Sequence, residues 1–308
     1  MGEISIDPKF NIHETYKKVR ILNPYRNTAV PSGGGYLLDT YDAVLAYSTL
    51  KLKTGSTSPL RVENTAAENL ELLFTDDSYS LSALVSDGRT LDQFRNGGKV
   101  IAYSWIDQTG QSNDIAGITG AKPTIVGTDN ILKTTNGKPS IFFNGSSKME
   151  RAAIAALNTG NAFTVYTVSS SSVTDTVGTI LSTSTASFET IRHFADTRSL
   201  KRNLYFGTPD GNFIADMSQV RTAANTPVLK AFSSTGNSIS SWDNKQNGTQ
   251  NFAFTGTYIN DTFKLGEQES GSTKLDGNLQ FIMIRAGVDD DTTRDAISTD
   301  IMALFNII

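Results

Sequence analysis

The chain has 308 residues, with 27 lysines and arginines against 31 aspartates and glutamates. This length accommodates one large β-sandwich or two smaller domains, and the formal net charge of −4 gives no electrostatic basis for binding nucleic acid or a membrane surface. No cysteine is present, which excludes disulfides, thiol chemistry and thiolate metal sites.

The first residues predict neither a secretion signal nor a membrane anchor. Met1–Phe10 carries Glu3 and Asp7 and lacks the apolar centre of a signal peptide. No stretch of about 18 consecutive apolar residues occurs, so we expect no membrane-spanning helix.

Residues 1–38 differ from the rest of the chain because they are locally basic and include the glycine-rich joint Pro31–Gly35. Glycine permits many backbone states, so this joint separates an N-terminal arm (1–38) from one large domain (39–308). The arm is either a frayed terminus or a segment that becomes ordered on a partner. In the second interpretation the docking residues surround an Asn-Pro-Tyr-Arg turn: Tyr16, Asn23, Pro24, Tyr25 and Arg26.

The first part of the large domain predicts helices around a pair of strands. A helix is predicted over 39–53, because apolar residues recur there at the spacing of one helix face, and Gly55 ends it. These apolar residues are Ala43, Val44, Tyr47 and Leu50. Residues 59–63 and 69–74 are typical of strands joined by a turn. Residues 80–94 suggest a short helix that stops at Asp87–Gly88.

From Val100 onward strands dominate the pattern, with Asx-Gly turns between them. The expected strands are 100–106, 123–127, 139–143, 162–170, 178–183, 201–207, 212–217, 227–233, 238–243, 251–254, 262–266 and 277–285. A final helix follows Asp291, with Ile297, Ile301, Leu304 and Phe305 on one face. The fold class is therefore all-β, a sandwich or jelly roll with a few short helices, including a C-terminal one.

The turn that follows the strand 100–106 is the best candidate binding site. Its polar side chains can bond to a ligand while Trp105 offers an apolar face, which gives these candidate residues: Trp105, Asp107, Gln108, Asn113 and Asp114. The competing interpretation is structural, because Asp and Asn in a glycine-containing turn often satisfy their own backbone. We favour the structural interpretation.

Other groups carry weaker signals. His13 and His193 are the only histidines, so a histidine-rich metal site or a catalytic triad is disfavoured. Asp289–Asp291 could bind calcium, but three carboxylates before a helix more often cap it. We expect no cofactor and no metal. Further carboxylates and aromatics near candidate turns and strands are Glu189, Asp196, Glu267, Glu269, Tyr103, Phe143, Trp242 and Tyr258.

Four blocks in order resemble the catalytic β-sandwich of α-L-arabinofuranosidase B and its phage-encoded relatives. The blocks are Ala46–Leu52, Ser58–Val62, Ile106–Asp114 and Gly137–Gly145, the last two reading Ile-Asp-Gln-Thr-Gly-Gln-Ser-Asn-Asp and Gly-Lys-Pro-Ser-Ile-Phe-Phe-Asn-Gly. The later residues are similar to concanavalin-A-like or laminin-G-like sandwiches. The resemblance thus implies a concanavalin-A-like jelly roll.

The resemblance implies a substrate pocket built around adjacent cysteines, which this chain lacks. It therefore implies the fold more strongly than the activity. We expect a bacteriophage virion component, a head or tail fibre or decoration protein assembled in the host cytoplasm. Its arm would bind other virion proteins, its copies would form a symmetric oligomer such as a trimer, and its sandwich would bind host-surface glycans. The alternative is a glycoside hydrolase of arabinofuranosidase type.

Overall fold

The computed structural model describes most of the chain after the arm. The described ranges are 35–158, 160–174, 176–185, 189–196, 202–208, 211–216, 223–236, 238–244, 246–247, 252–253, 259–267 and 273–308. The proposed docking residues of the arm, Tyr16 and 23–26, lie outside them. Leu37 and Leu38, at the expected boundary between arm and domain, are buried in the described part.

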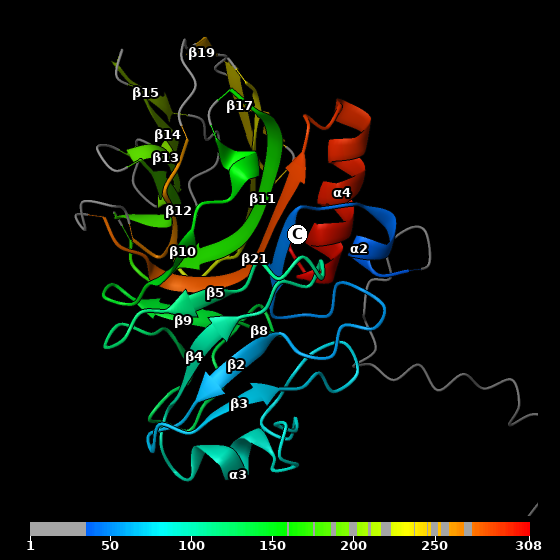
Figure 1. Ribbon diagram of the computed structural model, residues 1–308, viewed down its shortest axis with the longest axis vertical. Helices are drawn as coiled ribbons and strands as arrows, with labels where there is room; N and C mark the ends of the chain where they lie inside the picture. Colours follow the sequence, from blue (N-terminus) through cyan, green and yellow to red (C-terminus); the bar gives the residue numbers. More distant parts are fainter. Residues whose placement is uncertain are drawn as a thin grey trace, which may run out of the picture.

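The described chain is a mostly antiparallel β structure, as expected from the turn-and-strand pattern (Figure 1). Strands of the first half are β1 (Leu45–Ser48), β2 (Leu60–Glu63), β3 (Asn69–Leu72), β4 (Val100–Trp105), β5 (Ile115–Gly117), β6 (Thr124–Val126), β7 (Thr134–Thr135), β8 (Lys138–Pro139), β9 (Ile141–Asn144) and β10 (Met149–Ala152). Strands of the second half are β11 (Ala162–Ser171), β12 (Val177–Ser184), β13 (Glu189–Asp196), β14 (Arg202–Thr208), β15 (Gly211–Asp216), β16 (Val228–Thr235), β17 (Ser238–Asp243), β18 (Gln246–Asn247), β19 (Phe252–Ala253), β20 (Thr262–Leu265) and β21 (Asp276–Ala286). Helical segments are α2 (Leu37–Thr40), α3 (Leu91–Arg95), a 3₁₀ turn (Ala155–Leu157) and α4 (Asp291–Leu304).

The strands form one curled network in which β4 is the branch point. On one edge β4 pairs with β2, which in turn pairs with β3. Its other edge pairs with β5 and with β6, and these lead to two different series of strands. The first series runs through β10, β20, β12 and β13, and the second through β9, β21, β11, β16 and β17. The two series face each other as a β-sandwich.

Two apolar layers stabilise this arrangement. Residues of β11 alternate between them, because successive side chains of a strand point to opposite faces. Phe163 and Val165 enter the core between the two series of strands. Tyr166 and Val168 face the other way, into a second core that α4 covers (Figure 1).

The expected C-terminal helix is confirmed as α4. Asp290 caps it by accepting a hydrogen bond from the Thr293 N–H at 2.7 Å, one residue before the expected cap. Ile297, Ile301 and Phe305 are fully buried in the second core. None of the helices in the described ranges is both long and apolar enough to cross a membrane.

Two expected helices are wrong. Residues 39–53 contain only the last two residues of the short helix α2 and then β1, whose four residues are all buried. A strand buried on both faces shows no alternation, so its apolar run has the same appearance as a helix face. In 80–94, Leu84 and Val85 form bridges to Thr90 and Leu72, and the helix begins only after Thr90, which with Gln93 forms a capping box.

Every strand expected from Val100 onward overlaps a strand of the structure. The sequence pattern missed β5, β7, β10, β13 and β18, and all of these except β13 have four residues or fewer. Their shortness leaves too few residues to reveal a period of two.

Candidate functional site

Asp107 fixes the turn between β4 and β5. One carboxylate oxygen accepts hydrogen bonds from the backbone N–H of Ala46 at 3.0 Å and of Thr109 at 3.1 Å. The other accepts from the Thr109 hydroxyl at 2.7 Å and the Asn113 N–H at 3.2 Å. Both oxygens are thus occupied by protein donors, and the side chain is only 5% exposed. Asp107 holds the turn in place rather than presenting a free carboxylate.

Gln108 and Asn113 attach the same turn to the segment around β1. The buried Gln108 amide accepts from the Leu52 N–H at 2.9 Å and donates to the carbonyls of Ser48 and Leu50, both at 3.0 Å. Asn113 donates from its side-chain amide to the Val44 carbonyl at 2.9 Å. These contacts match the structural interpretation of the turn.

Trp105 lies in the core and offers no face to solvent. Its ring stacks on Tyr47, with 5.5 Å between centroids and 24° between planes, and is fully buried. Burial also raises the pKa of the Tyr47 phenol, whose O–H donates to the Asn113 carbonyl. The stacking face expected of Trp105 is therefore covered by protein.

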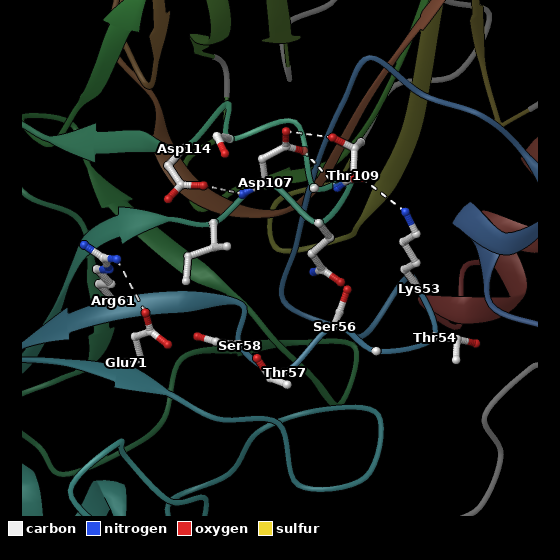
Figure 2. A pocket seen from close by; sticks show the side chains of 15 residues that line it. Lys53, Thr54, Ser56, Thr57, Ser58, Arg61, Glu71, Asp107, Thr109 and Asp114 are labelled. Carbon is white, nitrogen blue, oxygen red and sulfur yellow. Dashed lines mark hydrogen bonds and ion pairs between the residues drawn. The ribbon is translucent and has the colours of Figure 1, made fainter.

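A pocket of about 520 Å³ opens beside this turn. Its lining combines the loop after β1, the outward residues of β2 and β3, and the β4–β5 turn: Lys53, Thr54, Gly55, Ser56, Thr57, Ser58, Arg61, Glu71, Ile106, Asp107, Gln108, Thr109, Gly110, Ser112 and Asp114. Figure 2 shows Asp114, Arg61 and Glu71 gathered at one side and Lys53 and Thr54 at the opposite side. The pocket is polar and open to solvent.

Asp114 is the turn carboxylate that remains available. One of its oxygens accepts from the Asp107 N–H at 2.9 Å, which orients the group (Figure 2). The residue is exposed, and no described residue donates a hydrogen bond to its second oxygen. Asp114 therefore presents a fixed but free carboxylate oxygen at the pocket.

Charged groups at the rim were missed by sequence reasoning. Arg61 of β2 faces Glu71 of β3 at 3.5 Å, with both side chains about half exposed. Lys53 donates to the Thr109 carbonyl at 3.2 Å. The alternation of buried Leu60 and Val62 with Arg61 was the available signal, because it places Arg61 on the outer face.

Most of the other candidate groups have structural partners. Glu267, only 7% exposed, bonds to Lys148 at 2.7 Å and Lys274 at 3.4 Å. His193 is fully buried, with its ring Nε2 2.9 Å from the Thr167 hydroxyl. The ring of Trp242 lies under the Arg294 guanidinium, and Phe143 is in the core. The side chains of Glu189, Asp196, Tyr258 and Glu269 lie outside the described residues.

The three aspartates at the start of α4 serve separate roles. Asp289 pairs with Arg285 and accepts from the Tyr166 hydroxyl, Asp290 caps the helix, and Asp291 pairs with Arg294. Across the described ranges, no group of three or more His, Asp or Glu residues is placed to hold a metal ion.

The fold is shared with arabinofuranosidases. An arabinofuranosidase in complex with arabinofuranosyl-α-1,2-xylobiose matches with a TM-score of 0.61 at 14% identity, over 87% of this chain and 64% of that one. A mutant GH54 α-L-arabinofuranosidase soaked with 4-nitrophenyl α-L-arabinofuranoside matches with a TM-score of 0.59 at 14% identity, over 85% of this chain and 63% of that one. The chain thus spans less than two thirds of the length of either protein. No family model matches the sequence, and a search of curated proteins finds no match.

These matches confirm the resemblance at the level of fold and correct the expected function. The main interpretation, a phage virion fibre or decoration component, is wrong. Solved structures that share the fold over 85–87% of the chain include arabinofuranosidases, the class named as the alternative. Nothing in the fold or the matches supports a phage origin.

Proposed function

We propose that this protein acts on glycans and that its reaction is the hydrolysis of arabinofuranosyl linkages. The observation that supports this most is an open polar pocket with two accessible carboxylates, Asp114 and Glu71, on a sandwich whose fold is that of arabinofuranosidases. The matching structures support the fold, and the residues of this pocket support the chemistry.

Hydrolysis of a glycosidic bond requires two carboxyl groups, on opposite sides of the bond and about 5–10 Å apart. One protonates the departing oxygen, and the other attacks the sugar or activates water. Asp114 enters the pocket from the β4–β5 turn and Glu71 from β3, and β2, which pairs with both β3 and β4, lies between them (Figure 2). We assign the reacting carboxyl groups to this pair, because both oxygens of Asp107 are already occupied.

The remaining lining suits an uncharged sugar. The chain has no cysteine, so substrate must be held by other groups. Ser56, Thr57 and Ser112 also line the pocket and carry hydroxyl groups. Hydroxyl and amide groups of this kind fix the orientation of a sugar by hydrogen bonding to its own hydroxyls.

A panel of aryl glycosides tests the proposal with the full-length chain. We expect release of 4-nitrophenol from 4-nitrophenyl α-L-arabinofuranoside and at least about tenfold slower release from the β-D-xylopyranoside and α-L-arabinopyranoside, because a pocket shaped for one ring size positions others poorly. Absence of release from every member of the panel would contradict the proposed function.

A further inference from the structure

An exposed aromatic ring lies on the outer face of the sandwich beside the pocket. Along β4 the side chains of Val100 and Ala102 point into the core, so that of Tyr103 points out. Among the large hydrophobic side chains exposed in the described ranges, Tyr103 alone is aromatic, with 36% of its surface accessible. This exposed ring therefore lies on the strand that leads directly into the candidate site.

The ring is supported from the protein side. The Lys122 ammonium lies 4.6 Å from its centroid and forms a 2.7 Å ion pair with Glu63. These two side chains are only 10% and 15% exposed, so one face of the ring is covered by the largely buried Lys122 while 36% of Tyr103 stays accessible. Gly117 makes room for this support, because a Cβ there would lie 2.8 Å from the Lys122 Cγ. Tyr103 is therefore a fixed platform with one open face.

The platform adjoins the pocket. Arg61 pairs in register with Ser104, and Val62 pairs with Ala102, so Tyr103 is the bulged residue between these pairs. Arg61 and Tyr103 thus project outward from adjacent strands, where side chains of neighbouring positions are in reach of each other. Since Arg61 lines the pocket, the Tyr103 ring extends the rim of the pocket across the outer face of β2 and β4.

The charges around the platform are balanced. Arg61 is paired with Glu71, and Lys122 with Glu63. A surface with matched positive and negative groups favours an uncharged ligand over a nucleic acid or an anionic chain. Sugars meet this description, because their C–H faces stack on aromatic rings while their hydroxyls bond to charged and polar groups.

We propose that Tyr103 is a glycan subsite: it stacks on the sugar next to the one that enters the pocket. The inference rests on the proposed function for the identity of the ligand. It assigns Tyr103 a role in positioning a chain of sugars and none in the bond-breaking step. A substrate with a single sugar would not reach the platform, whereas an oligosaccharide would.

The test compares short and long ligands on the full-length chain. With arabinofuranosyl-xylobiose as substrate, Tyr103→Ala is expected to raise KM by about tenfold, whereas Tyr103→Phe, which keeps the ring, stays within about twofold. With methyl α-L-arabinofuranoside, whose leaving group is too small to reach the platform, KM and kcat of both variants should equal those of the wild type. Ile131→Ala, at an exposed hydrophobic residue away from the pocket, is the matched control.

Binding measured by calorimetry separates this inference from the proposed function. If the wild type hydrolyses nothing but binds arabinofuranosyl-xylobiose with an affinity that Tyr103→Ala weakens, the subsite stands and the hydrolysis proposal fails. If hydrolysis proceeds and Tyr103→Ala leaves KM for the oligosaccharide unchanged, the subsite is overturned. A wild type that neither binds nor hydrolyses the oligosaccharide also overturns it.

Discussion

At the scale of single residues, two aspartates of one turn have opposite roles. Asp107 receives four hydrogen bonds from protein donors, whereas exposed Asp114 receives one. We expect Asp107→Asn to lower the free energy of unfolding by about 3 kcal/mol, because its amide nitrogen would face N–H or O–H donors in a buried site. Asp114→Asn should change it by less than about 0.5 kcal/mol. Urea denaturation of both variants checks this, and equal effects would contradict the assignment.

The sequence pattern identified the turn after β4 as the candidate site but did not show which of its residues face solvent. Asp107, Gln108 and Asn113 were candidates for ligand binding and for a structural role, and their hydrogen bonds to the backbone fit the structural one. The sequence pattern favoured Trp105 over Tyr103 as the exposed ring, because the side of β4 that faces the core depends on the bulge at Tyr103 and on contacts with distant strands.

At the scale of elements, a buried ion pair links β16 and β17. Lys230 and Asp243 stand opposite each other in register, 3.3 Å apart, with side chains 3% and 5% exposed. Removing one partner leaves a buried charge, so Lys230→Met is expected to lower the free energy of unfolding by about 3–5 kcal/mol. The double variant Lys230→Met, Asp243→Leu should recover much of the loss. Thermal unfolding of the wild type, the two single variants and the double variant measures the coupling between the two side chains. Losses of stability that simply add in the double variant would contradict it.

The cap of α4 gives a pH dependence. The Thr293 backbone N–H bonds to Asp290 and lowers the pKa of that carboxyl below its ordinary value. A carboxyl whose pKa is lower in the folded state stabilises the fold above its unfolded pKa of about 3.9, and this contribution is lost as pH falls through the folded value. Asp290→Ala should therefore destabilise the protein at pH 7 and have little effect near pH 2. A constant difference between the variant and wild-type unfolding midpoints across this range would refute the assignment.

Helices and strands whose apolar residues recur with a clear period, or that end in clear turn residues, were predictable, and the other elements were not. Residues 291–304 show an apolar face and follow a run of carboxylates, and the structure confirms them as α4 with Asp290 as the cap. The strand β1 has no such pattern, because β21 pairs with it and both of its faces are covered. Burial on two faces is a property of the whole fold and leaves no local signal.

At the scale of the whole molecule, the sandwich was predictable and the pocket was not. Turn chemistry between β-rich segments suffices to predict an all-β fold. The pocket joins the loop at 53–58, Arg61, Glu71 and the turn at 106–114, which come together only through the pairing of β2 with β3 and β4. Such long-range pairing is not encoded in any one segment.

The central claim is that this pocket breaks a glycosidic bond with Asp114. The most direct measurement is the rate of 4-nitrophenol release from 4-nitrophenyl α-L-arabinofuranoside by Asp114→Asn, relative to Asp261→Asn at an exposed carboxylate outside the pocket. Loss of a reacting carboxyl should lower kcat by at least about 100-fold, while Asp261→Asn keeps the wild-type rate and both variants stay folded. Equal rates for the two variants would contradict the claim and place the reacting groups elsewhere on the sandwich.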